Sequence, residues 1–159
     1  MMVARIRLMP STRVTRSFNA PRELVYRALI DRDAVARWKV PTGMTIRVHE
    51  FDPTVGGTYR VSLTYDDPAR EGKTSARTDT YHGRFVELVP HRRVVETDEF
   101  ETDDPALQGQ MTITFDLADA SGGTELVAVH DGVPSGVSLT DNELGWRQAL
   151  DRLASIVER

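Results

Sequence analysis

The sequence predicts an α+β fold in which a β-sheet packs against one long helix at the C-terminal end of the chain. Residues 12–38 read as a short strand followed by two short helices, and residues 140–159 carry an apolar stripe of helical period. The chain between these segments alternates apolar and polar residues, as half-buried strands do. Such a sheet must bury its apolar face, and the terminal helix can cover it.

Length and composition are those of one globular domain. The chain has 159 residues, of which 40% are hydrophobic, and we expect a single domain over 1–159 with a loose N-terminal extension at 1–11. It contains no cysteine, which excludes disulfides, a thiol nucleophile and a thiolate metal site. No apolar run approaches the ~20 residues that a membrane-spanning helix needs. These features predict a cytoplasmic protein.

The net charge of −4 is unevenly distributed. Residues 1–40 hold nine of the 20 basic side chains but only three of the 24 acidic ones. The arginines alternate with apolar positions and form no basic stripe of the kind that nucleic-acid-binding proteins carry. We therefore expect no nucleic-acid partner.

The first strand, at 12–18, leads into two short predicted helices. Pro21 suits a first helical turn, and the apolar residues that follow recur on one face of a helix: Leu24, Val25, Ala28 and Leu29. Asp33 is the predicted N-cap of a second helix that places Val35 and Trp38 on one side.

The middle of the chain predicts six further strands. Alternation is clearest at Tyr59, Val61, Leu63 and Tyr65, and it also appears at 44–48, 80–89, 94–101, 110–119 and 124–131. Residues 66–79 contain Pro68 and Gly72 among mostly polar side chains, so we expect a long, exposed and mobile hairpin loop there.

The C-terminal helix has a predicted beginning and a predicted buried face. Thr140 followed by Glu143 fits a capping box. The apolar stripe consists of Trp146, Ala149, Leu150, Leu153, Ile156 and Val157. Asn142 and Gly145 extend this face, and Gly145 either lets the helix approach a strand or leaves space for a ligand.

The order of several motifs resembles a known superfamily. After the first strand come NAPRELVY at 19–26, Arg-Trp at 37–38, Pro-x-Gly at 41–43 and Gly-Gly at 56–57. Gly83 then precedes RFVELVP, and Val129-His130 precedes a helix with Gly145-Trp146 and Leu150-x-x-Leu153. Over residues 12–158 the chain resembles the START-like, or birch-pollen-allergen-like (SRPBCC), superfamily. Within it, the chain is similar to homologues of the C-terminal domain of the activator of the ninety-kilodalton heat-shock protein ATPase.

This resemblance implies a helix-grip fold, in which a curled antiparallel sheet of about seven strands surrounds the C-terminal helix and encloses a cavity. One position departs from the pattern, because Lys39 follows Trp38 where the family often has a second aromatic residue. The superfamily includes lipid carriers, hormone receptors, polyketide cyclases, dehydratases and co-chaperone domains, so the fold alone does not define the function.

Few residues suggest catalysis. The four histidines lack metal-site spacing, and no nucleophile elbow or nucleotide-binding glycine loop occurs, so we expect no metal and no cofactor. His130 shares a strand face with Leu126 and Ala128; it is either a structural histidine or a candidate acid, base or ligand anchor. The acidic strand at 94–101 reads as a solvated edge strand, although alternation can also turn a carboxylate inward toward His130.

These observations predict a protein that binds a hydrophobic or amphipathic small molecule, as a monomer or homodimer. The predicted ligand-binding residues are Trp38, Tyr59, Val61, Phe85, Ile113, Leu126, His130, Asn142 and Trp146. Two alternatives remain open. One is a cyclase- or dehydratase-like enzyme with His130 as the candidate catalytic residue, and the other is a chaperone-cofactor-like module that binds a protein partner.

Overall fold

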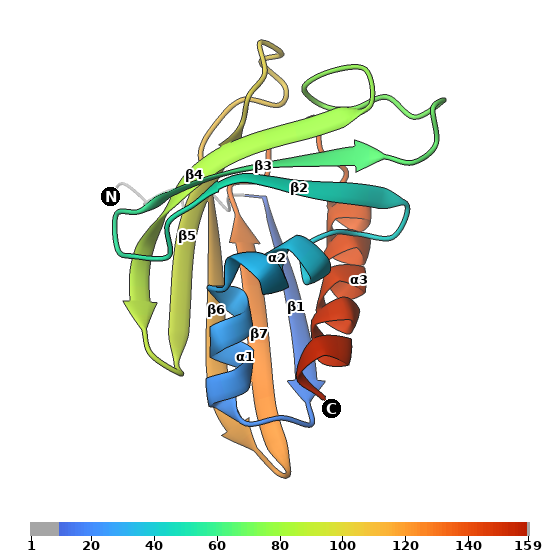
Figure 1. Cartoon of the computed structure of the whole chain (residues 1–159). Coiled ribbons are helices and arrows are strands. Elements are labelled where there is room, and N and C mark those ends of the chain that lie inside the picture. The colour runs from blue at the N-terminus through green and yellow to red at the C-terminus, as the bar shows by residue number, and fades with distance from the viewer. Residues whose placement is uncertain (1–9, 159) are drawn as a thin grey trace, which may run out of the picture.

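A computed structural model describes residues 10–158 as one curled sheet with three helices (Figure 1). The strands are β1 (Ser11–Phe18), β2 (Met44–Phe51), β3 (Thr58–Tyr65), β4 (Thr78–Val89), β5 (Arg93–Phe100), β6 (Met111–Ala120) and β7 (Gly123–Asp131). The helices are α1 (Arg22–Leu29), α2 (Arg32–Trp38) and α3 (Leu139–Val157). The predicted extension at 1–11 falls mostly outside the described residues, but Ser11 already pairs with Asp131 in the sheet.

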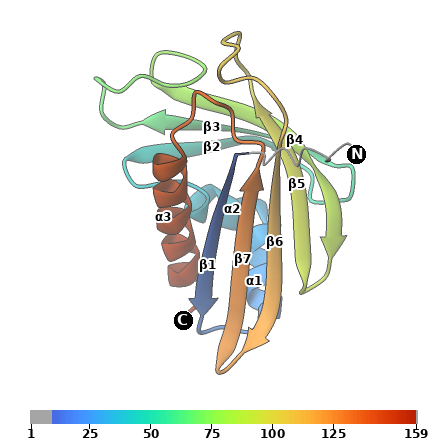
Figure 2. The same cartoon turned by 180° about the vertical axis from the view of Figure 1, so that it is seen from behind.

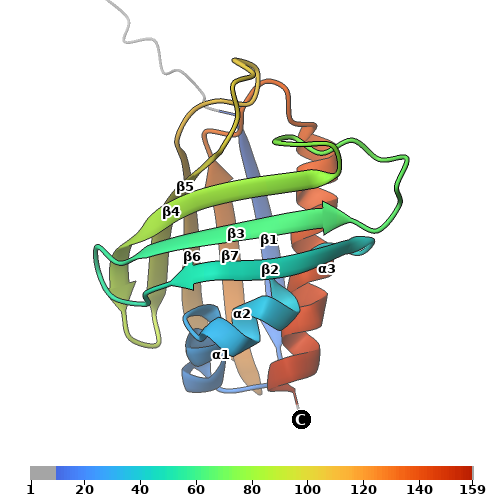
Figure 3. The same cartoon turned by 45° about the horizontal axis from the view of Figure 1, so that its top comes forward.

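The seven strands form one antiparallel sheet in the order β1-β7-β6-β5-β4-β3-β2. The sheet curls so that β2, β3 and β4 arch across the other strands, and α3 lies along the concave side next to β1 (Figures 1 and 3). Seen from behind, β1, β7 and β6 present their convex face (Figure 2). The predicted helix-grip fold with two short helices after the first strand is confirmed. In the described part of the chain, no helix is long and apolar enough to cross a membrane.

Both predicted caps were placed a few residues too late. The side chain of Asp31, not of Asp33, accepts a hydrogen bond from the backbone of Ala34 and begins α2. The side chain of Ser138 accepts from the backbone of Asp141, so α3 begins at Leu139 and Thr140 already lies inside the helix. In both places an earlier polar residue takes the extended backbone conformation that a cap requires.

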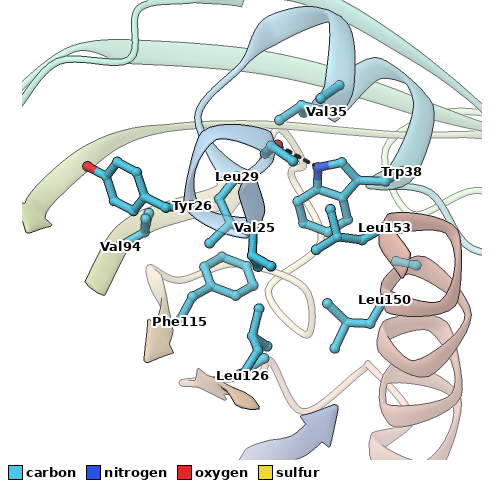
Figure 4. Packing of buried hydrophobic residues seen from close by; sticks show 14 of the residues in the cluster. Val25, Tyr26, Leu29, Val35, Trp38, Val94, Phe115, Leu126, Leu150 and Leu153 are labelled. Atoms are coloured by element: carbon cyan, nitrogen blue, oxygen red, sulfur yellow. Dashed lines mark hydrogen bonds between the residues drawn. The ribbon is translucent and has the colours of Figure 1, made fainter. Parts of the chain in front are cut away.

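The apolar core lies where α1, α2 and α3 pack against the sheet (Figure 4). Trp38 is fully buried, and its indole N–H donates to the carbonyl of Ala28 at 2.8 Å. Its ring meets Phe115 of β6 edge to face, with 6.3 Å between ring centroids. Leu150 and Leu153 of α3 are fully buried in the same cluster, so the predicted stripe does join helix to sheet.

Strand β5 is not the solvated edge strand that its acidic sequence suggested. It lies inside the sheet, between β4 and β6, and both Glu96 and Asp98 point to the concave side and are buried. The edges of the sheet are instead β1 and β2. Alternation along the strand was correct, but sequence could not identify its neighbours.

The loop between β3 and β4 is exposed for much of its length, as predicted, but β4 begins at Thr78, so Asp79 belongs to the sheet. Asp79 is buried, and its two carboxylate oxygens accept from the backbone N–H of Lys73 at 2.5 Å and from the Lys73 ammonium at 2.8 Å. These two bonds tie the centre of the loop to the start of the strand.

Candidate functional site

Two adjacent rows of paired residues carry polar side chains across the concave face of the sheet. One row runs from Tyr59 through Gly83 and Asp98 to Met111, across β3, β4, β5 and β6. The neighbouring row runs across β4, β5, β6, β7 and β1 through Phe85, Glu96, Ile113, His130 and Thr12. Antiparallel register therefore brings residues from six strands together on one face, and the N-terminal half of α3 contacts the His130 and Thr12 end of these rows.

Lys39 brings a positive charge into this interior. It caps the C-terminal end of α2, and its ammonium pairs with Glu96, whose side chain is 2% exposed, while that of Lys39 is 10% exposed. The ammonium also lies 5.4 Å from the centre of the Tyr59 ring. Lys39 thus places a buried ion pair on the concave face of the sheet.

Asp98 is the least satisfied polar group of the interior. Its residue is 5% exposed, and no hydrogen-bond partner among residues 10–158 lies within reach of its Oδ1 atom. The Tyr59 hydroxyl lies 3.4 Å from Oδ2 and 3.2 Å from the carbonyl of Thr97. Buried polar groups are nearly always paired, so an orphaned carboxylate oxygen calls for a functional explanation.

Gly83 makes room for this contact. A β-carbon at position 83 would lie 1.9 Å from the Thr97 carbonyl oxygen and 2.8 Å from the Tyr59 hydroxyl. The missing side chain therefore lets Tyr59 reach across β4 toward Asp98.

The pKa of Asp98 is raised to about 7, and burial is the largest cause. The ammonium of Lys39 opposes this shift, the carboxylate of Glu96 adds to it, and the hydrogen bond from Tyr59 opposes it. Near neutral pH this carboxyl group therefore exists in both protonation states, which is uncommon for an aspartate.

His130 is held by side chains of two other elements, α3 and β6. Its Nδ1 atom receives the indole N–H of Trp146 at 3.0 Å and the amide of Asn142 at 3.1 Å. Two donors at Nδ1 assign the ring proton to Nε2, which faces the sulfur of Met111 at 3.1 Å. The Asn142 amide also donates to the hydroxyl of Thr12 at 3.0 Å. His130 thus joins the sheet to α3.

Burial, together with the smaller effect of the Lys39 ammonium, lowers the pKa of His130 to about 4. The imidazole is therefore neutral at physiological pH, and protein groups already occupy both of its nitrogens. These contacts support the interpretation as a structural histidine and make His130 a poor proton acceptor in this arrangement.

The predicted ligand-binding residues fall into three groups. Trp38 and Leu126 belong to the apolar core near α1 and α2. Tyr59 and Phe85 pack together with 5.4 Å between ring centroids, and Val61 lies two residues along β3 from Tyr59. The third group consists of Ile113, His130, Asn142 and Trp146, of which Asn142 and Trp146 are half-buried.

Sequence reasoning did not assign Lys39, Glu96, Asp98 or Met111 to the site. Alternation does predict that Glu96 and Asp98 share a face with Val94 and Phe100, but it does not say which face of the strand points inward. For Lys39, the one indication in the sequence was that a lysine follows Trp38 where the resemblance leads one to expect a second aromatic residue.

Gly145 does not face the sheet. Among residues 10–158, the one atom outside the helix within 4 Å of a β-carbon built there is the β-carbon of Pro41, at 3.6 Å. The interpretation that Gly145 lets α3 approach a strand is therefore wrong.

Other surfaces of residues 10–158 offer less chemistry. A shallow hollow of about 510 Å³ lies beside Val55, Val86 and Arg84, and one of about 200 Å³ lies between β1 and the start of α3. No group of three or more His, Asp or Glu residues in the described chain is placed to hold a metal ion.

Comparison with known proteins gives the same architecture. The family model described as "Activator of Hsp90 ATPase homolog 1-like protein" matches residues 19–158. A crystal structure of a Chromobacterium violaceum protein is 38% identical, with a TM-score of 0.83, covering 94% of this chain and 97% of that one.

More distant relatives share the fold. The crystal structure of the AHSA1 protein from Silicibacter pomeroyi is 18% identical with a TM-score of 0.74, and covers 94% of this chain and 98% of that one. A solution structure from Staphylococcus epidermidis is 17% identical with a TM-score of 0.74, over 98% and 94% of the two chains. No curated protein matches the chain.

Proposed function

The chain belongs to the family of activator of Hsp90 ATPase homolog 1-like proteins, within the START-like superfamily, and we propose that it binds a small amphipathic molecule between α3 and the concave face of the sheet. The observation that carries this proposal is the buried, unpartnered Oδ1 atom of Asp98. A ligand group that donates a hydrogen bond to this atom would satisfy it. Ligand sites typically combine apolar walls with a few such polar groups.

Aromatic side chains near Asp98 would receive the apolar part of the ligand. Tyr59 packs against Tyr81 with 6.2 Å between ring centroids, and Phe100 pairs with Tyr81 in the sheet. Trp146 of α3, which is half-buried, lies at the His130 end of the polar rows and packs against Phe115. This arrangement favours a ligand with one aromatic or aliphatic body and one polar head.

Titration of tryptophan fluorescence with amphipathic compounds tests the proposal, because Trp146 contacts His130 at the edge of the polar rows. We expect a saturable change for phenylpropanol or a related compound that is at least tenfold weaker in Asp98→Leu. The Trp146→Phe variant identifies the signal. The absence of saturable binding by every compound, together with native mass spectrometry showing no retained small molecule, would exclude the proposal.

An enzyme acting on a hydrophobic carbonyl compound is a second candidate, favoured by one observation. The pKa of Asp98, about 7, is suited to both accepting and donating a proton near neutral pH. Asp98, rather than His130, would then be the acid or base of a cyclase- or dehydratase-like reaction. Turnover of a bound carbonyl compound that disappears in Asp98→Asn would establish it.

A further inference from the structure

The arrangement of charges in the interior indicates which polar head the site prefers. We infer, building on the proposed function, that the ligand is an amine that binds in its protonated form, with its ammonium group on the Oδ1 atom of Asp98 and its apolar body against the neighbouring aromatic rings. This inference identifies a chemical class of ligand, which the family and the fold do not.

The charge balance is the first argument. Two lysines reach the concave face, and each is already paired, Lys39 with Glu96 and Lys73 with Asp79. Asp98 forms no salt bridge with any residue from 10 to 158. An ionised Asp98 is therefore a buried charge without a partner, which is costly until a cation arrives. A ligand carboxylate would add a third negative charge beside Glu96 and Asp98, so an anionic head is disfavoured.

Hydrogen-bond geometry is the second argument. Oδ1 of Asp98 has no donor among the described residues, and Oδ2 has only the long 3.4 Å contact with Tyr59. An ammonium group carries up to three donors, so it can satisfy Oδ1 and still reach a second acceptor. A hydroxyl group offers one donor and leaves the charge of Asp98 uncompensated.

The aromatic surroundings are the third argument. Tyr59 already receives a cation, the Lys39 ammonium, 5.4 Å from its ring centre, and Lys73 lies 5.7 Å from the ring of Phe100 at the far end of β5. Burial raises the pKa values of Tyr59 and Tyr81 well above that of free tyrosine, so both rings remain neutral and attract cations.

The titratable groups that act on the pKa of Asp98 or pack beside it have defined roles in the expected pH dependence. Lys39 of α2 and Glu96 of β5 are paired, and Tyr59 of β3 and Tyr81 of β4 are neutral. His130 of β7 is neutral above about pH 4. His82 lies on the opposite face of β4, between Glu99 and Glu101. A simple aliphatic amine, with a pKa near ~10, stays protonated at the pH values of interest.

A matched set of probes tests the inference: phenylpropylamine, phenylpropanol and phenylpropanoate, titrated by calorimetry or tryptophan fluorescence. At about pH 8 the amine should bind at least tenfold more tightly than the alcohol, and phenylpropanoate should bind most weakly. Below about pH 7 the amine should lose about tenfold in affinity per pH unit, because Asp98 takes up a proton that competes with the ammonium. The alcohol should show no such loss.

Two variants complete the test. Asp98→Asn should weaken the amine at least tenfold and abolish its pH dependence, while phenylpropanol changes less than about threefold. Glu99→Gln is the matched control, because it removes a carboxylate from the next position of β5, on the exposed face, and should leave all affinities unchanged.

The outcomes separate the two proposals. Equal or tighter binding of the alcohol, or an amine affinity that does not fall with pH, overturns the amine inference and leaves the proposed function standing. Amine binding that is unchanged in Asp98→Asn also overturns it. If no probe binds to the wild-type protein, the proposed function itself is wrong. The wild-type pH series decides the inference even if Asp98→Asn folds poorly.

Discussion

The indole N–H of Trp146 donates to Nδ1 of His130 at 3.0 Å, so a neutral imidazole joins the terminal helix to the sheet. The Trp146 ring also meets Phe115 of β6 edge to face, with 5.7 Å between centroids. The same bond holds His130 with its proton on Nε2, and the imidazole therefore adds no charge to an interior that already contains Lys39, Glu96 and Asp98.

Replacing Trp146 should separate the packing of its ring from its hydrogen bond. Trp146→Phe keeps an aromatic ring against Phe115 and should lower the free energy of unfolding by about 1 kcal/mol. Trp146→Ala should lower it by about 3 kcal/mol, because contact with the sheet is lost as well. Urea unfolding measures both values, and a loss below about 1 kcal/mol in Trp146→Ala would contradict the joining role of this residue.

Asp98 should make the protein less stable than an apolar residue would at the same position. Asp98→Leu removes a buried carboxylate with an unpartnered oxygen, and we expect the free energy of unfolding at about pH 8 to rise by about 1–3 kcal/mol. Tyr59 keeps its bond to the carbonyl of Thr97. Chemical denaturation measures the change. A loss of stability would mean that the orphaned oxygen is satisfied within the folded protein, and would weaken the argument for a ligand.

The pKa values of Asp98 and His130 should give opposite pH dependences of stability. Asp98, with its pKa raised to about 7, keeps a proton on folding, so its contribution makes stability fall as pH rises from about 4 to 7. His130, with its pKa lowered to about 4, releases a proton on folding, so its contribution is present above about pH 6.5 and is lost as pH falls toward 4. Between about pH 4.5 and 6, the change of stability with pH that Asp98 contributes largely cancels the one that His130 contributes.

Replacing Asp98 or His130 singly should reveal how much each residue contributes to the pH dependence of stability. Relative to wild type, Asp98→Asn should become more stable with rising pH in this window, by about 1 kcal/mol per pH unit, and His130→Gln should show the reverse. Urea unfolding at several pH values measures both. Parallel curves for wild type and Asp98→Asn would show that Asp98 is ionised throughout this range.

Much of the fold could be predicted because periodicity is a local property. The stripe through Leu150 and Leu153 and the alternation through Tyr59 and Val61 each specify a buried face without knowledge of any partner. Strand order is not local, which is why the acidic β5 was misplaced at an edge.

The site was harder to predict, because its contacts join residues that are far apart in the sequence. Glu96 is tolerated inside the sheet because Lys39, 57 residues earlier, reaches it from α2. Asp98 is exceptional because no residue between 10 and 158 does the same for its Oδ1 atom. Alternation can place a carboxylate inside a sheet, but it cannot say whether that carboxylate has a partner.

Gly83 and Gly145 should respond differently to replacement by alanine. At Gly83 the new β-carbon would lie 1.9 Å from the Thr97 carbonyl oxygen, so Gly83→Ala should cost about 3 kcal/mol or more and displace Tyr59 from Asp98. At Gly145 it meets only Pro41, at 3.6 Å, and alanine is the better helix former, so Gly145→Ala should raise the free energy of unfolding by about 0.5–1 kcal/mol. Thermal or urea unfolding of the two variants checks both signs at once. A destabilised Gly145→Ala protein would indicate that α3 lies closer to the Pro41 loop than the 3.6 Å contact implies, and a tolerated Gly83→Ala would mean that β4 can shift without losing the approach of Tyr59 to Asp98.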